Sequence, residues 1–149
     1  MKKEKINEIS ARFTALSKNE ALARIIITGF LMPYSPSVEE IADIKTAVSE
    51  AVTNAVVHAY KGREAGAVYL RAYITSAGEF CVSVIDKGCG IEDVEKAMEP
   101  LFTTDAENER SGMGFSIMQT FSDKFRVVSR VGSGTRVTMT RRLESFKSE

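Results

Sequence analysis

The chain has 149 residues, of which 44% are hydrophobic and 27% are charged, with 20 basic and 20 acidic side chains. This length predicts one domain, residues 1–149, that buries roughly two thirds of its unfolded surface. The balanced charge, without a long run of either sign, gives no indication of a nucleic-acid-binding tail. Because neither a secretory signal nor a stretch of ~20 apolar residues is present, we expect a cytoplasmic protein.

The first part of the chain predicts a strand followed by two helices. Alternating apolar residues predict a strand from Ile9 to Ala15. Ser17 to Leu31 is expected to form a helix, with Ser17 as N-cap and Glu20 as its capping-box partner. A long helix from Ser37 to about Tyr60 follows from a 3.6-residue apolar period. The expected apolar face of the first helix consists of Ala21, Leu22, Ile25 and Ile26.

Four further strand patterns follow, joined in pairs by short turns. The connections Ser76-Ala-Gly78 and Gly132-Ser-Gly134 are of hairpin length, so antiparallel pairing is implied. Short helices are expected near Ile91 to Met98 and from about Gly112 to Phe121. Helices on one face of an antiparallel sheet make a two-layer α+β sandwich. The four strands are Ala67 to Thr75, Glu79 to Asp86, Phe125 to Arg130 and Thr135 to Arg142.

Three polar residues on the long helix are spaced by four and therefore share one helical face: Glu50, Asn54 and His58. A solvated surface is the simpler interpretation, but the neighbours are small or apolar rather than a mixture of Lys and Glu. An amide oxygen such as that of Asn54 suits Mg²⁺, which takes few protein ligands beside substrate phosphates. A carboxylate one turn away, Glu50, could orient or deprotonate an incoming hydroxyl.

A glycine-containing turn, Asp86-Lys-Gly-Cys-Gly90, follows the second of these strand patterns. Such turns also occur in hairpins and calcium loops, so the motif alone is weak evidence. Its functional interpretation is specific, because the Asp86 carboxylate would accept a hydrogen bond from the adenine amine, whereas guanine has an oxygen there. Gly88 and Gly90 complete this candidate adenine site. Cys89 and Cys81 match neither a disulfide framework nor a zinc spacing and are expected to be free thiols.

A second glycine motif, Arg110-Ser-Gly-Met-Gly114, precedes the next predicted helix. Unpaired N–H groups at a helix start favour phosphate oxygens where glycine allows close approach, although glycines also simply end and begin helices. Arg110 could reach the terminal phosphate. The polar stretch from Thr103 to Arg110 is expected to form a mobile lid over the nucleotide. Thr135 could support the adenine pocket through its hydroxyl, or be an ordinary strand residue.

These motifs resemble those of a known ATPase superfamily. Ser49-Glu-Ala-Val-Thr-Asn-Ala55, Asp86-x-Gly-x-Gly90 and the glycine lid resemble the N, G1 and G2 boxes of gyrase B, MutL and sensor histidine kinases. The resemblance implies the Bergerat fold and binding of ATP or ADP with Mg²⁺. Closer similarity, over about Phe13 to Leu143, is to the sporulation anti-sigma F factor family. It is carried by Leu16-Ser-x-Asn-Glu20, Ala23-Arg24, Pro100-Leu-Phe-Thr-Thr104 and Glu109-Arg-Ser-Gly-Met-Gly-Phe115.

This closer resemblance implies a homodimer that holds a sporulation sigma factor inactive and phosphorylates a serine of an anti-anti-sigma factor. It implies Glu50 as catalytic base, Asn54 as magnesium ligand, Asp86 as adenine reader and Arg110 as phosphate contact. Arg24 would contact the protein partners, although alone it would be a solvated helix arginine. Asp105 departs from the basic residue expected after the paired threonines. The nucleotide-binding residues are then Asn54, Asp86, Gly88, Gly90, Thr103, Thr104, Ser111, Gly112, Met113, Gly114 and Thr135.

Three alternatives remain at the level of the sequence. A general-stress anti-sigma kinase would share the fold, the nucleotide and the reaction. A detached histidine-kinase catalytic domain would need a phosphoacceptor histidine, yet the one histidine of the chain, His58, lies inside the proposed ATP site. A nucleotide-gated sigma-binding module would need no phosphoryl transfer, and the presence of Glu50 argues against it.

Overall fold

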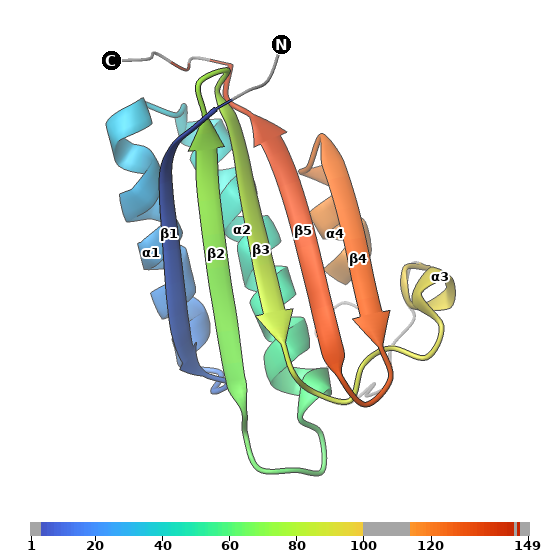
Figure 1. Ribbon diagram of the computed structural model, residues 1–149. Helices are drawn as coiled ribbons and strands as arrows, with labels where there is room; N and C mark the ends of the chain where they lie inside the picture. The colour runs from blue at the N-terminus through green and yellow to red at the C-terminus, as the bar shows by residue number, and fades with distance from the viewer. Residues whose placement is uncertain (1–3, 100–113, 145, 147–149) are drawn as a thin grey trace.

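The computed structural model describes residues 4–99, 114–144 and 146, and these form a five-stranded antiparallel sheet backed by helices (Figure 1). The strand order across the sheet is β1-β2-β3-β5-β4. Two strands have the predicted bounds, whereas β1 begins four residues before Ile9, because its first residues are exposed and lack an apolar alternation. The strands are β1 Lys5–Thr14, β2 Ala67–Thr75, β3 Glu79–Asp86, β4 Lys124–Arg130 and β5 Gly134–Arg142.

Three helices, α1, α2 and α4, lie behind the sheet in the view of Figure 1, and within the described ranges the front face carries none. The predicted two-layer α+β sandwich is therefore confirmed. In the same ranges, no helix is both long and apolar enough to span a bilayer. The helical elements are α1 Asn19–Leu31, the 3-10 turn η1 Met32–Tyr34, α2 Val38–Asn54, the π-helical turn η2 Ala55–Ala59, α3 Val94–Ala97 and α4 Gly114–Thr120.

The hydrophobic core lies between α2 and the inner face of the sheet. Val48 and Val52 on α2 are completely buried, as are Leu70 and Ile74 on β2. Full burial of such a side chain contributes roughly 1.5–3 kcal/mol. The period of α2 and the alternation along β2 thus produce matching apolar surfaces, and this packing fixes the position of α2 behind the sheet.

Two sequence predictions about α1 are wrong. Ser17 does not cap the helix, because its backbone carbonyl, not its hydroxyl, accepts the Glu20 N–H at 3.2 Å, and the N-cap residue Lys18 makes no side-chain cap. The buried face is also different from the predicted one: Leu22 and Ile25 are 42% and 68% exposed. Apolar residues occupy every position from Ala21 to Ile27 except Arg24, so periodicity could not select the inner face. The buried residues are Ala23, Ile27, Phe30 and Leu31.

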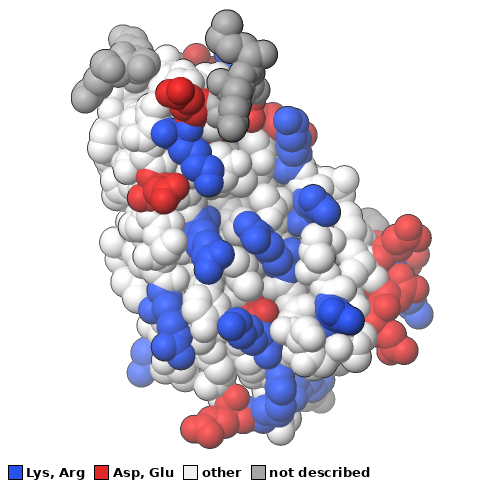
Figure 2. Space-filling model, viewed as in Figure 1, with Lys and Arg blue, Asp and Glu red and all other residues white. Residues whose placement is uncertain are grey.

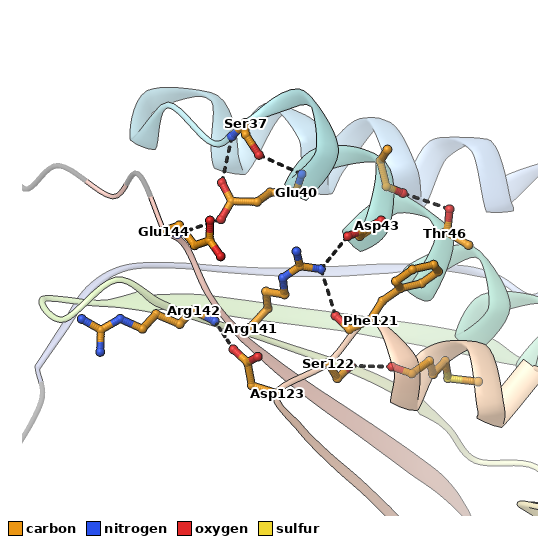
Figure 3. Close-up of polar contacts among 12 residues, drawn as sticks. Ser37, Glu40, Asp43, Thr46, Phe121, Ser122, Asp123, Arg141, Arg142 and Glu144 are labelled. Carbon is orange, nitrogen blue, oxygen red and sulfur yellow. Dashed lines mark hydrogen bonds and ion pairs between the residues drawn. The ribbon is translucent and has the colours of Figure 1, made fainter.

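A polar network fixes the first turn of α2 to the end of β5 (Figure 3). Ser37 and Glu40 form a capping box, with Ser37 Oγ accepting the Glu40 N–H at 3.0 Å and Glu40 Oε1 accepting the Ser37 N–H at 2.8 Å. The other Glu40 oxygen accepts the Glu144 N–H at 2.7 Å. Nearby, Arg141 pairs with Asp43 at 2.9 Å. Burial raises the pKa of Glu40, but these backbone and hydroxyl donors and Arg141 outweigh it, so its pKa is lowered overall.

Candidate nucleotide-binding site

A cavity of about 870 Å³ opens where α2 and η2, the end of β3, the α3 segment and the start of α4 meet. Its volume lies within the range of roughly 300–1,000 Å³ that is typical of small-molecule sites. Apolar residues of the sheet, such as Val84 and Val137, form part of its wall. Five of the predicted nucleotide-binding residues line it: Asn54, Asp86, Gly90, Gly114 and Thr135.

Asp86 ends β3 at the inner wall of the cavity and is 9% exposed. Its Oδ1 accepts the Gly88 N–H at 2.9 Å, and the Thr135 backbone donates a second hydrogen bond. Burial raises the pKa of this carboxyl, and the two backbone donors and the nearby Arg63 offset that effect incompletely. Asp86 is therefore an acceptor with a fixed orientation, and a further hydrogen-bond donor would stabilise its buried carboxylate.

Thr135 connects the cavity wall to a residue that the sequence analysis missed. Its hydroxyl lies 2.8 Å from Ser129 Oγ, which in turn accepts the Ile91 N–H at 2.7 Å. Ser129 and Thr135 are paired neighbours in the β4–β5 hairpin. Counting this register back from Gly132-Ser-Gly134 would have identified Ser129. The pair joins β4 and β5 to Ile91, which follows Gly90. The Ser129 hydroxyl therefore contacts both Thr135 in the cavity wall and the loop after β3.

The loop after β3 is pressed between the end of η2 and the β4–β5 turn. A Cβ on Gly88 would collide with the Ala59 carbonyl, which accepts the Cys89 N–H at 2.8 Å. Gly90 has a φ of 79°, and its Cβ would meet the Arg130 carbonyl. The two glycines therefore permit close backbone packing, which holds Asp86 at the wall. Cys81 and Cys89 are both free thiols, as predicted.

Glu50 and Asn54 meet the first described residue of α4. A Cβ on Gly114 would lie 3.3 Å from Asn54 Oδ1 and 3.3 Å from Glu50 Oε2. Both side chains thus lie between two helices rather than on a solvated face. No cluster of three His, Cys, Asp or Glu side chains suited to a metal occurs in the described ranges. One amide oxygen beside one carboxylate fits an ion that takes few protein ligands, such as Mg²⁺.

The other predicted site residues are distributed as follows. Arg24 is on α1 and pairs with Glu20 at 3.5 Å; it does not line the cavity. His58 lines the cavity, as do Lys61 and Lys96, two cations that no motif had indicated. Thr103, Thr104, Arg110, Ser111, Gly112 and Met113, and the lid from Thr103 to Arg110, lie outside the described residues.

Comparisons with known proteins agree with the fold and the cavity. Residues 13–141 match the family model of the histidine kinase-like ATPase domain. The RsbU and RsbW domains of a Mycobacterium tuberculosis protein share the fold, with a TM-score of 0.68 at 23% identity, covering 92% of this chain and 32% of that one. Fold and matched residues define the class, a histidine kinase-like ATPase domain, and this class implies ATP binding.

Relatives identify the family more narrowly. An anti-sigma F factor of Thermoanaerobacter sp. is 49% identical over 144 residues, which cover 97% of this chain and 99% of the relative. One from Caldanaerobacter subterraneus is 52% identical over 135 residues, covering 91% and 93% of the two chains. The chain belongs to the anti-sigma F factor family.

Proposed function

We propose that this chain is an ATP-dependent serine kinase and anti-sigma factor. It would hold a sporulation sigma factor inactive and phosphorylate a serine of the anti-anti-sigma factor that opposes it. The relatives named anti-sigma F factor support the first activity. The second activity is supported by one observation: Glu50 and Asn54 lie beside Gly114, and Asn54 and Gly114 line the cavity whose wall holds Asp86.

In this proposal, Asp86 selects adenine. Its carboxylate, fixed by the Gly88 and Thr135 N–H groups, accepts a hydrogen bond from the adenine amine. Guanine has an oxygen at that position, so two acceptors would face each other without a proton between them. Leaving a buried acceptor unpaired costs about 1–3 kcal/mol, which favours ATP over GTP. The hydroxyls of Thr135 and Ser129 hold this wall in place.

Asn54 is the proposed protein ligand of Mg²⁺, which would offset the negative charge of the phosphates. Glu50 lies one helical turn away and orients the serine hydroxyl of the partner. The serine Oγ forms a bond to the γ-phosphorus while the bond to the β,γ-bridging oxygen breaks, ADP leaves, and Glu50 accepts the hydroxyl proton. Arg110 and the backbone of Ser111 to Gly114 are proposed to contact the phosphates, with Thr103 and Thr104 in the lid.

We further propose that the chain forms a homodimer and that Arg24 contacts its protein partners. Leu22 and Ile25 on α1 and Met32 on η1 are 42%, 68% and 60% exposed, and β1 is an edge strand of the sheet in the described ranges. Exposed apolar side chains beside an unpaired strand edge favour association. A second copy of the chain would cover both features, which supports the homodimer.

A nucleotide-gated module without catalysis is the second candidate, because sequestration of a sigma factor needs no phosphoryl transfer. The carboxylate of Glu50 beside Asn54 favours the kinase. A detached histidine-kinase catalytic domain is disfavoured, because it would need a phosphoacceptor histidine on a separate dimerisation helix. The one histidine of the chain, His58, instead lines the cavity itself.

The deciding experiment combines the purified protein with γ-labelled ATP, Mg²⁺ and the candidate anti-anti-sigma factor. Phosphoserine on the partner, lost in Glu50→Gln, is the expected result. ATP binding without transfer to the partner would favour the nucleotide-gated module. Sigma binding measured in parallel, with ADP and with ATP, tests whether the nucleotide state changes partner choice.

A further inference from the structure

The face of the sheet opposite the helices is rich in arginine. Because strand side chains alternate between faces, Phe13, Leu70 and Val137 point into the core and their neighbours point outward. Figure 2 views this face and shows basic side chains gathered over the strands, with acidic ones toward the margin and over α3. The sheet-face arginines are Arg12, Arg71, Arg126 and Arg136, and all four are exposed.

The strand register arranges these arginines as two pairs. Arg12 on β1 lies diagonally from Arg71 on β2, and Arg136 on β5 lies diagonally from Arg126 on β4. Diagonal neighbours are about 7–8 Å apart, and three strand spacings of about 4.8 Å separate Arg71 from Arg126. Ile85, on β3 between the pairs, is half-buried. The result is two positive sites on either side of a centre that consists of Ile85 and the mutually hydrogen-bonded hydroxyls of Ser83 and Thr138.

In the described part of the chain, no ion pair joins one of the sheet-face arginines to a carboxylate. Ion pairs between other described residues include Lys5 with Glu8, Arg24 with Glu20 and Arg141 with Asp43. Arg136 instead donates a long hydrogen bond, 3.5 Å, to Ser83 Oγ. The chain as a whole is neutral. Charge is therefore segregated, and this face has positive potential that an acidic surface would complement.

We propose that the sheet face is a docking surface for an acidic patch of a protein partner. Arginine forks pair with carboxylates in a bidentate manner, and arginine is enriched at protein interfaces. The rings that a nucleic-acid base would need are occupied: Arg12 and Lys87 lie 5.8 and 5.4 Å from the Tyr69 ring centroid, and Lys5 lies 4.4 Å from that of Tyr73. A pI near 6.6 also argues against a nucleic-acid surface.

This surface is additional to the proposed kinase site. Thr135 and Val137 of β5 face the nucleotide cavity, whereas Arg136 between them faces the opposite side of the sheet. A partner on the sheet face would therefore leave the cavity accessible. Binding to the two sites can be measured separately.

The test uses the full chain and a fluorescently labelled peptide that alternates glutamate with leucine. Fluorescence anisotropy should detect binding that weakens with added salt, and Arg71→Glu combined with Arg126→Glu should reduce the affinity about tenfold or more. The matched control, Lys18→Glu with Lys45→Glu, makes the same charge change on the helix side and should leave the affinity unchanged. ATP affinity of both variants should equal that of the wild type, which reports an intact fold.

Equal peptide affinity in the wild type and the sheet-face variant would overturn the proposal. Tighter binding of oligothymidylate than of the peptide at equal charge would also overturn it, in favour of a nucleic-acid surface. If the double charge reversal does not fold, the neutral pair Arg71→Gln with Arg126→Gln provides the same comparison. Loss of kinase activity in other experiments would not affect this result, because the readout is peptide binding alone.

Discussion

The two ends of α2 use carboxylates for different purposes. At the first turn, Glu40 is 3% exposed, and both of its oxygens accept backbone N–H groups within the chain. At the last turn, Glu50 and Asn54 lie against Gly114, next to a cavity. The first end is closed by its own hydrogen bonds, whereas at the second end Asn54 lines the cavity, with Glu50 one turn away against Gly114. One helix thus provides both a fixed anchor and a candidate site.

The direction of the pKa shift also differs between Glu40, the anchor at the start of α2, and Asp86, the carboxylate in the cavity wall at the end of β3. Burial raises the pKa of Glu40, but enough donors surround it that its pKa is lowered overall. Burial also raises the pKa of Asp86, and its donors do not compensate fully, so its pKa stays raised. Glu40, whose donors outweigh its burial, therefore acts as an anchor, whereas Asp86, whose burial outweighs its donors, would be stabilised by a further donor from a ligand. This contrast leads to four predictions.

The largest effect is expected at Glu50. Glu50→Gln keeps the size and polarity of the side chain but removes the proton acceptor. Phosphoryl transfer should therefore fall by roughly 10²–10⁴-fold. ATP affinity, measured by calorimetry, should stay within a few-fold of wild type. Wild-type turnover in this variant would remove Glu50 from the mechanism.

Asp86→Asn should weaken ATP binding roughly ten- to a hundredfold, because the amide is a poorer acceptor for the adenine amine. The preference for ATP over GTP should narrow as well. Calorimetric titrations with both nucleotides measure the two effects. Unchanged ATP affinity would contradict the adenine assignment.

At the other end of α2, Glu40→Ala should lower the free energy of unfolding by about 1–3 kcal/mol, since the Ser37 and Glu144 N–H groups lose their acceptor. Urea denaturation measures the loss. Thr46→Ala is the control: its exposed hydroxyl bonds the Ala42 carbonyl one turn earlier, so the expected change is within about 0.5 kcal/mol. If Glu40→Ala reduced the free energy of ATP binding by more than the free energy of unfolding, Glu40 would not be a purely structural anchor.

The smallest effect is expected in the pH dependence of stability. Because the folded pKa of Glu40 lies below its usual value of 4.5, its contribution is present above that value and is lost as the pH falls through the folded pKa. Asp86 acts in the opposite sense, since its raised pKa makes the folded state relatively more stable as the pH falls through that pKa. Acid titrations of Glu40→Gln should be shallower than wild type, and those of Asp86→Asn steeper. A steeper titration in Glu40→Gln would contradict the assigned shift.

The sheet was predictable because its signals are local. Alternation in β2 and β3, together with the short turn between them, sets the bounds and the pairing without knowledge of the rest of the chain. The spacing of Glu50 and Asn54 likewise gave a shared helical face. Their assigned roles remain predictions, although the structure brings Asn54 and Asp86 to one cavity.

The missed features depend on packing between distant segments. The inner face of α1 was decided by its neighbours, since Ala23 and Ile27 do not differ in polarity from Leu22 and Ile25. The link from Glu40 to Glu144 joins positions 104 residues apart, which no local pattern encodes. Ser129 was recoverable from the hairpin register, but its bond to the Ile91 N–H was not.

The π-helical turn at Ala55–Ala59 predicts where the chain can lose a residue. A π turn holds one residue more than an α-helical turn, so it is equivalent to a one-residue insertion directly after α2. Removing one residue there would let the segment continue the α-helical period, with the residues beyond it close to their present positions. The contacts of the Ala59 carbonyl with the Cys89 N–H and of the Tyr60 hydroxyl with the Lys87 N–H could then persist. Single-residue deletions in this turn should therefore be better tolerated than deletions earlier in α2, which would rotate the residues that follow by about 100°.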